Sequence, residues 1–129
     1  MAINFDKALG LHEESLNIRR TRTELIASNI ANADTPGYKA RDIDFRTALA
    51  DVSLDNLSLN RTDGQHIFAG DQVDSNIQYR QVDQPSVDGN TVDIHKEKSA
   101  FAENTVRYQA TVDFLGRKFS GLKNAFKGE

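Results

Sequence analysis

The C-terminal part of this 129-residue chain carries the pattern that most constrains its fold, a heptad repeat of mainly apolar residues. The repeat steps by four and three through Phe101, Thr105, Tyr108, Val112, Leu115, Phe119, Leu122 and Phe126. This spacing is typical of a long helix that packs against another helix. Gly116 and Gly121 lie inside it, where each costs roughly 1 kcal/mol relative to Ala. We interpret these glycines as room for the close approach of a neighbouring backbone.

The N-terminal segment has two apolar rows when it is placed on a helical wheel. One row holds Leu9, Leu16, Ile26 and Ile30, and a nearly opposite row repeats every seven residues at Leu11, Ile18 and Leu25. A helix of a small globular domain needs only one apolar stripe. Two stripes therefore indicate two partners, one in the same chain and one outside it. The alternatives are a helix buried in its own domain and a plain antiparallel hairpin with the last helix.

We therefore predict a mainly α fold in which long helices over residues 9–31 and 97–126 pack as a coiled coil. Between them we expect a small irregular or β-hairpin region. The assembly interface is expected at the apolar positions of both helices: Leu9, Leu11, Leu16, Ile18, Leu25, Ile26, Ile30, Phe101, Tyr108, Val112, Leu115, Phe119, Leu122 and Phe126.

The middle of the chain is acidic. Residues 42–95 hold three basic and ten acidic side chains, a balance of −7, whereas residues 1–41 carry +1 and residues 96–129 carry +3. This distribution argues against a nucleic-acid-binding protein, which concentrates Lys and Arg on one element. Residues 42–50 predict a short helix with a capping Asp, and residues 52–54, 57–59 and 77–79 alternate like short strands. We expect three segments: 1–41 with the first helix and its turn, 42–95 with the weak β-ribbon and loops, and 96–129 with the heptad helix.

Residue patterns that support catalysis or metal binding are missing from the sequence. It has no Cys, no Gly-rich phosphate loop after a strand, and no histidines at ligand spacing. We interpret DGNTVD at residues 88–93 as a turn that leads into the last helix, because it lacks the full spacing of a calcium loop. We therefore predict that the protein is not an enzyme and has no cofactor, metal, small-molecule substrate or nucleic-acid partner.

A basic cluster at Arg19, Arg20 and Arg22 leaves two interpretations open. One is a solvated face that is balanced by nearby glutamates, and the other is a contact with the acidic surface of another subunit. No stretch approaches the roughly 20 apolar residues that cross a bilayer. The N-terminus MAINFDKALG also lacks the pattern of a secretory signal peptide.

The end of the first helix is unusually rich in residues that stop helices. Asn side chains compete for backbone hydrogen bonds, and Pro36 disfavours the helical conformation of Thr35. Pro-Gly suits the two central positions of a type II turn. The segment therefore predicts a helix end, a tight turn and an extended departure. The turn motif consists of Asn29, Asn32, Thr35, Pro36, Gly37 and Tyr38.

Two stretches of the chain resemble one known family. The first reads SNIANADTPGYKA and resembles the N-terminal signature of the bacterial flagellar axial proteins, those of rod, hook and hook junction. The second reads DGNTVDIHKEKSAFAENTVRYQATVDFLGRKFSGLKNAF and is similar to the proximal rod members of that family. The resemblance touches most of residues 9–126 and is weakest over residues 51–76.

The resemblance implies a structural subunit of the flagellar basal body, whose termini become helical as it self-assembles into the proximal rod, a hollow shaft that transmits torque. The implied partners are copies of itself, the rod proteins FlgC, FlgF and FlgG, the FliE adaptor, the MS-ring protein FliF and the flagellar export gate. The implied location is the rod in the periplasmic space, reached through the flagellar type III system without a cleaved signal. The alternatives are a cytoplasmic helical adaptor or export chaperone, and another axial subunit such as FlgC.

Overall fold

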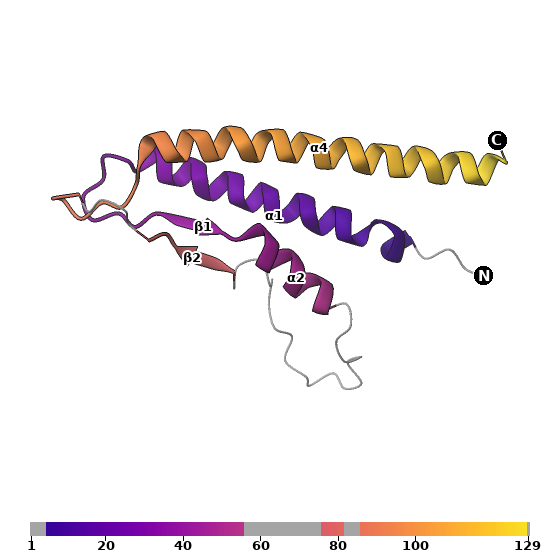
Figure 1. Cartoon of the computed structure of the whole chain (residues 1–129), viewed down its shortest axis with the longest axis horizontal. Coiled ribbons are helices and arrows are strands. Elements are labelled where there is room, and N and C mark those ends of the chain that lie inside the picture. The colour runs from indigo at the N-terminus through magenta and orange to yellow at the C-terminus, as the bar shows by residue number, and fades with distance from the viewer. Residues whose placement is uncertain (1–4, 56–75, 82–85, 129) are drawn as a thin grey trace.

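The computed structural model describes residues 5–55, 76–81 and 86–128. Two long helices, α1 (Phe5–Ala31) and α4 (Ile94–Lys127), run side by side in opposite directions (Figure 1). The short strands β1 (Arg41–Ile43) and β2 (Ile77–Tyr79) and the helix α2 (Phe45–Asp55) lie below the pair of long helices in Figure 1, where β1 and α2 pack against α1. The predicted mainly α fold, with paired terminal helices and a small two-stranded middle, is confirmed.

The ends of α4 follow from local chemistry. Asp93 has an extended backbone, and its side chain accepts hydrogen bonds from the backbone N–H groups of His95 and Lys96, which makes it the N-cap. At the other end Gly128 adopts a left-handed conformation with φ of 74° and donates to the carbonyl of Asn124. The interpretation of DGNTVD as a turn leading into the last helix is confirmed. At 34 residues α4 is about 50 Å long.

The strands β1 and β2 form an antiparallel ribbon in which Asp42 lies opposite Gln78 and Ile43 opposite Ile77. After β1, the carboxylate of Asp44 accepts hydrogen bonds from the backbone N–H groups of Arg46 and Thr47 and so starts α2. The strand predicted at residues 77–79 is therefore confirmed. The short helix predicted over residues 42–50 is present and has a capping Asp, but it begins at Phe45, and Asp42 and Ile43 belong to β1 instead because they pair with β2.

The strand predicted at residues 52–54 is wrong, because these residues continue α2. Phe45, Leu49 and Val52 are spaced at four and three residues and pack together against the core, so the helical period prevails over a three-residue alternation. The predicted strand at residues 57–59 lies outside the described residues.

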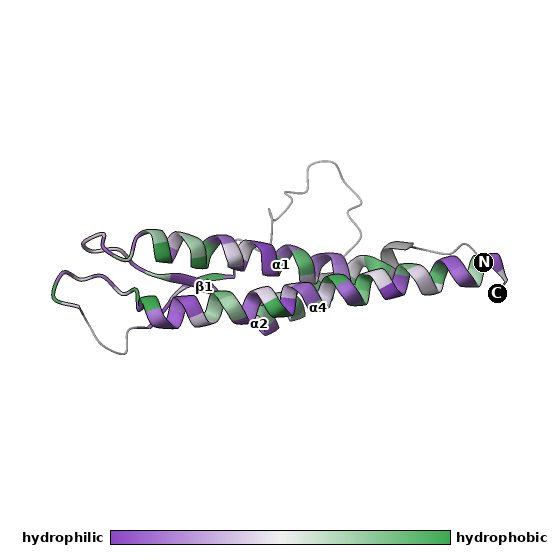
Figure 2. Ribbon diagram, turned by 90° about the horizontal axis from the view of Figure 1, so that it is seen from above, coloured by the Kyte–Doolittle hydropathy of each residue, from purple (hydrophilic) through white to green (hydrophobic). Residues whose placement is uncertain are grey.

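The apolar core lies between α1, β1 and α2 and does not involve α4. It consists of Ile18, Leu25, Ile43 and Ala48, with Ile77 among the half-buried residues packed against it. No apolar residue of α4 is buried within the described part of the chain. Apolar and polar residues alternate along the length of α4 (Figure 2). Among the described helices, none combines the length and the apolar character needed to cross a membrane.

Candidate functional site

The contact between α1 and α4 is polar. The buried residues of α4 are Glu97, Asn104 and Thr111, which recur every seven residues and therefore lie on one face of the helix. Glu97 is 0% exposed and Asn104 is 1% exposed. The heptad of apolar residues lies beside this polar row and not on it. The predicted pairing of the two helices exists, but its inner seam is made of hydrogen bonds.

At the centre of the seam Asn104 Nδ2 donates to the carbonyl oxygen of Arg19 at 3.0 Å and to Thr23 Oγ1 at 2.8 Å. Arg19 Nε donates to Thr111 Oγ1 at 3.2 Å, and its guanidinium lies 3.9 Å from the ring centroid of Phe45. Burial lowers the pKa of Arg19 from its usual value, and the nearby Arg107 and Arg22 lower it further. Arg19 thus connects α1 to α4 and to α2 at once.

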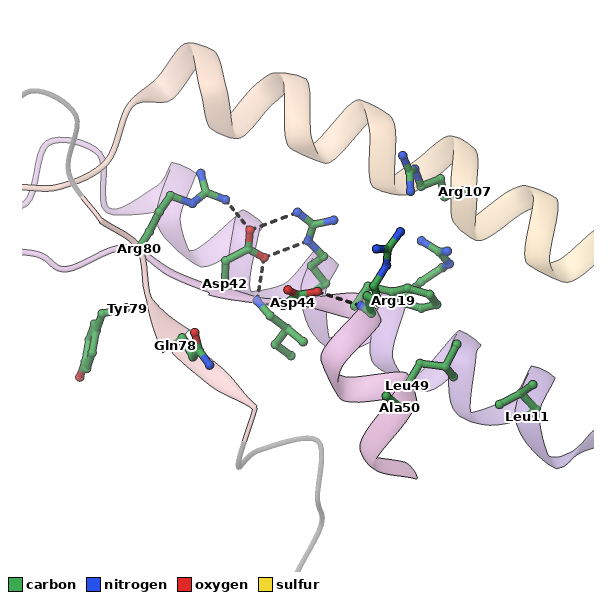
Figure 3. Close-up of a pocket in the computed structure, with 14 residues that line it drawn as sticks. Leu11, Arg19, Asp42, Asp44, Leu49, Ala50, Gln78, Tyr79, Arg80 and Arg107 are labelled. Atoms are coloured by element: carbon green, nitrogen blue, oxygen red, sulfur yellow. Dashed lines mark hydrogen bonds and ion pairs between the residues drawn. The ribbon is translucent and has the colours of Figure 1, made fainter. Parts of the chain in front are cut away.

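A second network ties the β-ribbon to both long helices. Asp42 of β1 accepts from Arg22 Nε at 2.9 Å and from Arg22 Nη2 at 3.1 Å, and it also accepts from Arg80 Nη2 at 2.6 Å (Figure 3). Arg80 pairs in turn with the fully buried Glu97 of α4. Glu97 also accepts from Asn29 Nδ2 at 3.2 Å. One chain of charged and polar groups therefore joins α1, β1, α4 and Arg80, the residue that follows β2.

The electrostatics of this network favour its ionised form. Burial by itself raises the pKa of Asp42, but the hydrogen bonds from Arg22 and Arg80 outweigh burial and lower this pKa below its ordinary value. The hydrogen bond to Asp42 raises the pKa of Arg22. These charges satisfy one another, so they stabilise the fold and leave no free acid or base for catalysis at Asp42.

The groove in Figure 3 lies between α1, α2, the ribbon and α4 and has a volume of about 890 Å³. Arg22, Arg80 and Asp42 on its wall are paired with one another. Within the described ranges, no three or more His, Cys, Asp or Glu side chains lie close enough together to hold a metal ion.

The side-chain amide of Asn29 forms hydrogen bonds with both backbone groups of Arg41, the first residue of β1, as the backbone of a neighbouring strand would. Its amide nitrogen donates to the carbonyl of Arg41 at 2.8 Å, and its amide oxygen accepts from the N–H of Arg41 at 3.1 Å. The side chain is fully buried. Asn29 therefore lies inside α1 and connects it to the first residue of the strand, although its residue type alone suggests only a helix end.

The turn after α1 has the predicted geometry. The N–H of Tyr38 donates to the carbonyl of Thr35 at 3.3 Å, and Gly37 has φ of 73°. With Pro36 at the first central position and Gly37 at the second, this is a type II turn. Asn32 and Thr35 add local bonds: Asn32 Nδ2 donates to the carbonyl of Ser28 at 2.8 Å, and Thr35 Oγ1 donates to Asn32 Oδ1 at 3.2 Å.

A second turn before α4 closes the end of α1. The amide nitrogen of Asn90 lies within hydrogen-bond distance of three carbonyl oxygens, those of Asn32 at 3.0 Å, Ala33 at 2.7 Å and Thr35 at 2.9 Å. Gly37 N–H donates to the carbonyl of Asp88 at 2.9 Å. The two turns therefore cap each other, and the conspicuous TPGY segment serves to join the entrance of α4 to the exit of α1.

Most residues predicted at the assembly interface lie at the surface of this single chain. Leu9, Leu16, Ile30, Leu115 and Leu122 are half-buried. The more exposed residues have relative accessibilities from 37% at Tyr108 to 60% at Phe126, and they are Leu11, Phe101, Tyr108, Val112, Phe119 and Phe126. An apolar surface therefore follows α4 over most of its length.

Three other residues predicted at that interface are buried inside the chain. Ile18 and Leu25 belong to the core with α2 and β1, and Ile26 is also fully buried. Their side chains stabilise the fold of one subunit and are covered from a neighbour in this conformation. The row that contains Leu11, Ile18 and Leu25 is thus the one turned mainly toward the same chain.

The three arginines of the basic cluster on α1 make different contacts. Arg20 forms an exposed i, i+4 ion pair with Glu24 at 3.5 Å, as the solvated interpretation expects. Arg19 and Arg22 instead make the interior contacts described above. The acidic partner of Arg22 is Asp42 of its own chain.

Sequence reasoning missed Asn90, Asp42, Arg80 and the polar row of α4. Asn90 and Arg80 carry no periodic signal, because their partners lie far away in the sequence. The row was detectable in principle, since Glu97, Asn104 and Thr111 repeat at the same seven-residue interval as the apolar heptad.

Comparison with known proteins places the chain among flagellar proteins. The model of the family described as "Flagella basal body rod protein" matches residues 10–39, which cover most of α1 and the turn that follows it. Over 131 residues the chain is 46% identical to the flagellar basal body rod protein FlgB of Aeromonas hydrophila, with 100% of this chain and 99% of that protein covered.

Two further relatives bear the same name. The FlgB protein of Cereibacter sphaeroides is 48% identical, with 97% of this chain and 98% of that protein covered. The FlgB protein of Salmonella typhimurium is 43% identical, with 99% of each chain covered. This full-length likeness does not favour the two alternatives, a cytoplasmic adaptor and another axial subunit. It indicates a structural protein of the flagellar rod and not an enzyme. The chain therefore belongs to the FlgB family of flagellar basal body rod proteins.

Proposed function

We propose that this rod subunit assembles with copies of itself through the apolar residues that its fold leaves exposed on α4. The observation that carries the proposal is the polar contact between α1 and α4. Because Asn104 and Thr111 occupy that contact, Phe101, Tyr108 and Phe119 stay at the surface with 37% to 50% of their area exposed. A long apolar surface on a small chain is typical of an interaction site.

The free energy available at this surface is substantial. Completing the burial of one half-exposed aromatic side chain contributes on the order of 1–2 kcal/mol. Several such residues along one helix therefore supply enough to join subunits, and the polar seam between α1 and α4 leaves them accessible. The same contacts repeated from subunit to subunit produce a helical polymer.

The function is mechanical: repeated helix packing forms a hollow shaft that transmits torque and leaves a channel for export. In that shaft the N-terminal segment 1–41 and the C-terminal segment 96–129 form the inner layer, and residues 42–95 form a smaller outer piece. The β-ribbon and α2 lie together below the pair of long helices in Figure 1, which supports this division.

The neighbours follow from the same assignment. They are other copies of the chain, the rod proteins FlgC, FlgF and FlgG, the FliE adaptor, the MS-ring protein FliF and the export gate. The subunit reaches the proximal rod in the periplasmic space through the flagellar type III system without a cleaved signal. The rod name of the relatives supports the location, and the resemblance of the TPGY and DGNTVD stretches to axial proteins supports the partners.

The test places a charge in the exposed apolar row. Phe119→Asp is expected to block rod assembly without hindering export, because the carboxylate is desolvated at the contact. Val87→Asp is the control, since Val87 is fully exposed on the turn before α4 and lies outside the row. Export is measured by immunoblot of the secreted chain, and assembly by motility and by electron microscopy of basal bodies. Normal swimming of the Phe119→Asp strain would refute the proposal.

A further inference from the structure

We propose that self-assembly joins two unlike surfaces, the basic end of α4 in one copy and an acidic hollow on α1 in the next. This inference rests on the proposed function, because it names the contact through which copies associate. In this contact each copy of the chain binds a second copy of the same chain.

The acidic hollow has a volume of about 380 Å³ and lies where α1 passes Tyr108 of α4. Leu16 and Tyr108 supply its apolar part, and Glu13 and Glu14 supply its charge. The one arginine on its wall, Arg20, already pairs with Glu24. Among the described residues neither Glu13 nor Glu14 forms an ion pair, so the hollow offers two carboxylates to a basic partner.

The complementary surface is the last part of α4. Residues 113–127 hold four basic side chains and one acidic side chain, which gives 4 − 1 = +3, whereas residues 5–16 hold one basic and three acidic side chains, which gives 1 − 3 = −2. Lys123 and Lys127 follow Phe119 at intervals of four residues and therefore lie along the same side of the helix. Phe119 and Phe126 are 50% and 60% exposed there. This end thus presents aromatic rings together with ammonium groups.

The two surfaces do not satisfy each other inside one chain. The helices diverge toward the start of α1, and α4 continues beyond it (Figure 1). In the described ranges the hydrogen bonds between α1 and α4 run from Asn29–Glu97 to Arg19–Thr111, and none joins α1 before Arg19 to α4 beyond Thr111. A Cβ placed on Gly116 or Gly121 meets nothing within 4 Å. The space that these glycines provide is therefore left for another molecule.

Joining unlike surfaces has a consequence for the polymer. A contact between two different patches is heterologous, so every added copy leaves one basic end and one acidic hollow unoccupied. Such a contact continues into a filament unless its rotation closes a ring. Its electrostatic part weakens as salt rises, because exposed charges are screened.

The experiment uses charge reversal in the full chain. One variant carries Glu13→Lys and Glu14→Lys, a second carries Lys123→Glu and Lys127→Glu, and a third carries all four changes. Lys98→Glu is the control, because Lys98 is exposed at the opposite end of α4. Association is measured by analytical ultracentrifugation over a concentration series at two ionic strengths, and circular dichroism verifies equal helicity.

Each double variant alone is expected to need about tenfold more protein to associate, since attraction is replaced by repulsion in exposed pairs. An equimolar mixture of the two double variants is expected to associate like the unmodified chain, because each basic surface then meets an acidic surface of the other variant. The fourfold variant is expected to associate alone, and Lys98→Glu to behave like the unmodified chain.

Recovery in the fourfold variant without recovery in the mixture would show that the charges pair within one chain and would overturn the inference. Double variants that associate like the unmodified chain would also overturn it while leaving the proposed function intact. An unmodified chain that stays monomeric at every concentration would refute the proposed self-association and, with it, this contact.

Discussion

Asn90 is expected to be among the residues whose replacement destabilises the fold most, although it lies in a turn and outside the apolar core. Its amide joins the turn before α4 to the end of α1 across more than fifty residues. The perturbation is Asn90→Ala, which removes the amide and leaves the backbone free to keep its course.

The magnitude follows from the contacts that are lost. Two N–H donors of Asn90 serve three carbonyl oxygens at 2.7–3.0 Å, and its Oδ1 accepts from the N–H of Val92 at 2.8 Å. Each hydrogen bond contributes about 1 kcal/mol net, and a carbonyl left without a partner costs more when it is buried. We expect a loss of about 2–4 kcal/mol in the free energy of unfolding, which lowers Tm by roughly 10 °C in a chain of this size.

The assay is urea unfolding followed by far-UV circular dichroism, below the concentration of self-association and in a stabilising osmolyte. Asn90→Asp is the sharper comparison, because it keeps the shape but turns a carboxylate toward three carbonyl oxygens, and it is expected to be worse than Asn90→Ala. Asn124→Ala, at an exposed position near the end of α4, is the control and is expected within about 0.5 kcal/mol of the unmodified chain. A loss below about 1 kcal/mol in Asn90→Ala would refute the proposed role of this amide.

Three further predictions concern the network, the glycines and the seam. Folding lowers the pKa of Asp42, so the ionised carboxylate contributes its full stabilisation above the unfolded pKa of about 3.9. That stabilisation is lost as the pH falls through the lower pKa of the folded state. Asp42→Asn should therefore reduce the dependence of the free energy of unfolding on pH at acid pH, measured by urea unfolding. Gly37→Ala should lower the free energy of unfolding by about 1 kcal/mol, because φ of 73° disfavours a residue with a Cβ. Gly116→Ala should raise the free energy of unfolding of the isolated chain by up to about 1 kcal/mol, because Ala favours a helix more than Gly and the added Cβ meets no atom within 4 Å. An equal effect at both positions would contradict the assigned geometry. Asn104 Nδ2 donates two hydrogen bonds across the seam, whereas its Oδ1 is buried without a hydrogen-bond partner among the described residues. Each lost hydrogen bond costs about 1 kcal/mol and removal of the unpaired oxygen offsets part of that cost, so Asn104→Leu should lower the free energy of unfolding by about 1 kcal/mol in a melting experiment. Unchanged or higher stability would show that the seam does not depend on this amide.

Local chemistry determined much of this protein directly from its sequence. The Pro36-Gly37 turn follows the end of α1, and the Asp93 cap marks the start of α4, because each depends on residues a few positions apart. The apolar periods predicted both long helices, but they placed the start of α1 four residues and the start of α4 three residues too late. The acidic middle and the TPGY signature likewise need no knowledge of the fold. For this reason the mainly α architecture, the turn and the resemblance to flagellar axial proteins were accessible from the chain alone.

The tertiary structure decided which face of each helix meets which neighbour. A period shows that residues share a face, but it does not choose between two faces of α1 or between the apolar and polar rows of α4. That choice depends on partners distant in sequence, such as Asp42 for Arg22 and Arg19 for Thr111. With Ile18 and Leu25 turned toward the ribbon and α2, a polar row was left to hold α4, and the aromatic row of α4 stayed at the surface because no element of the same chain covers it among the described residues.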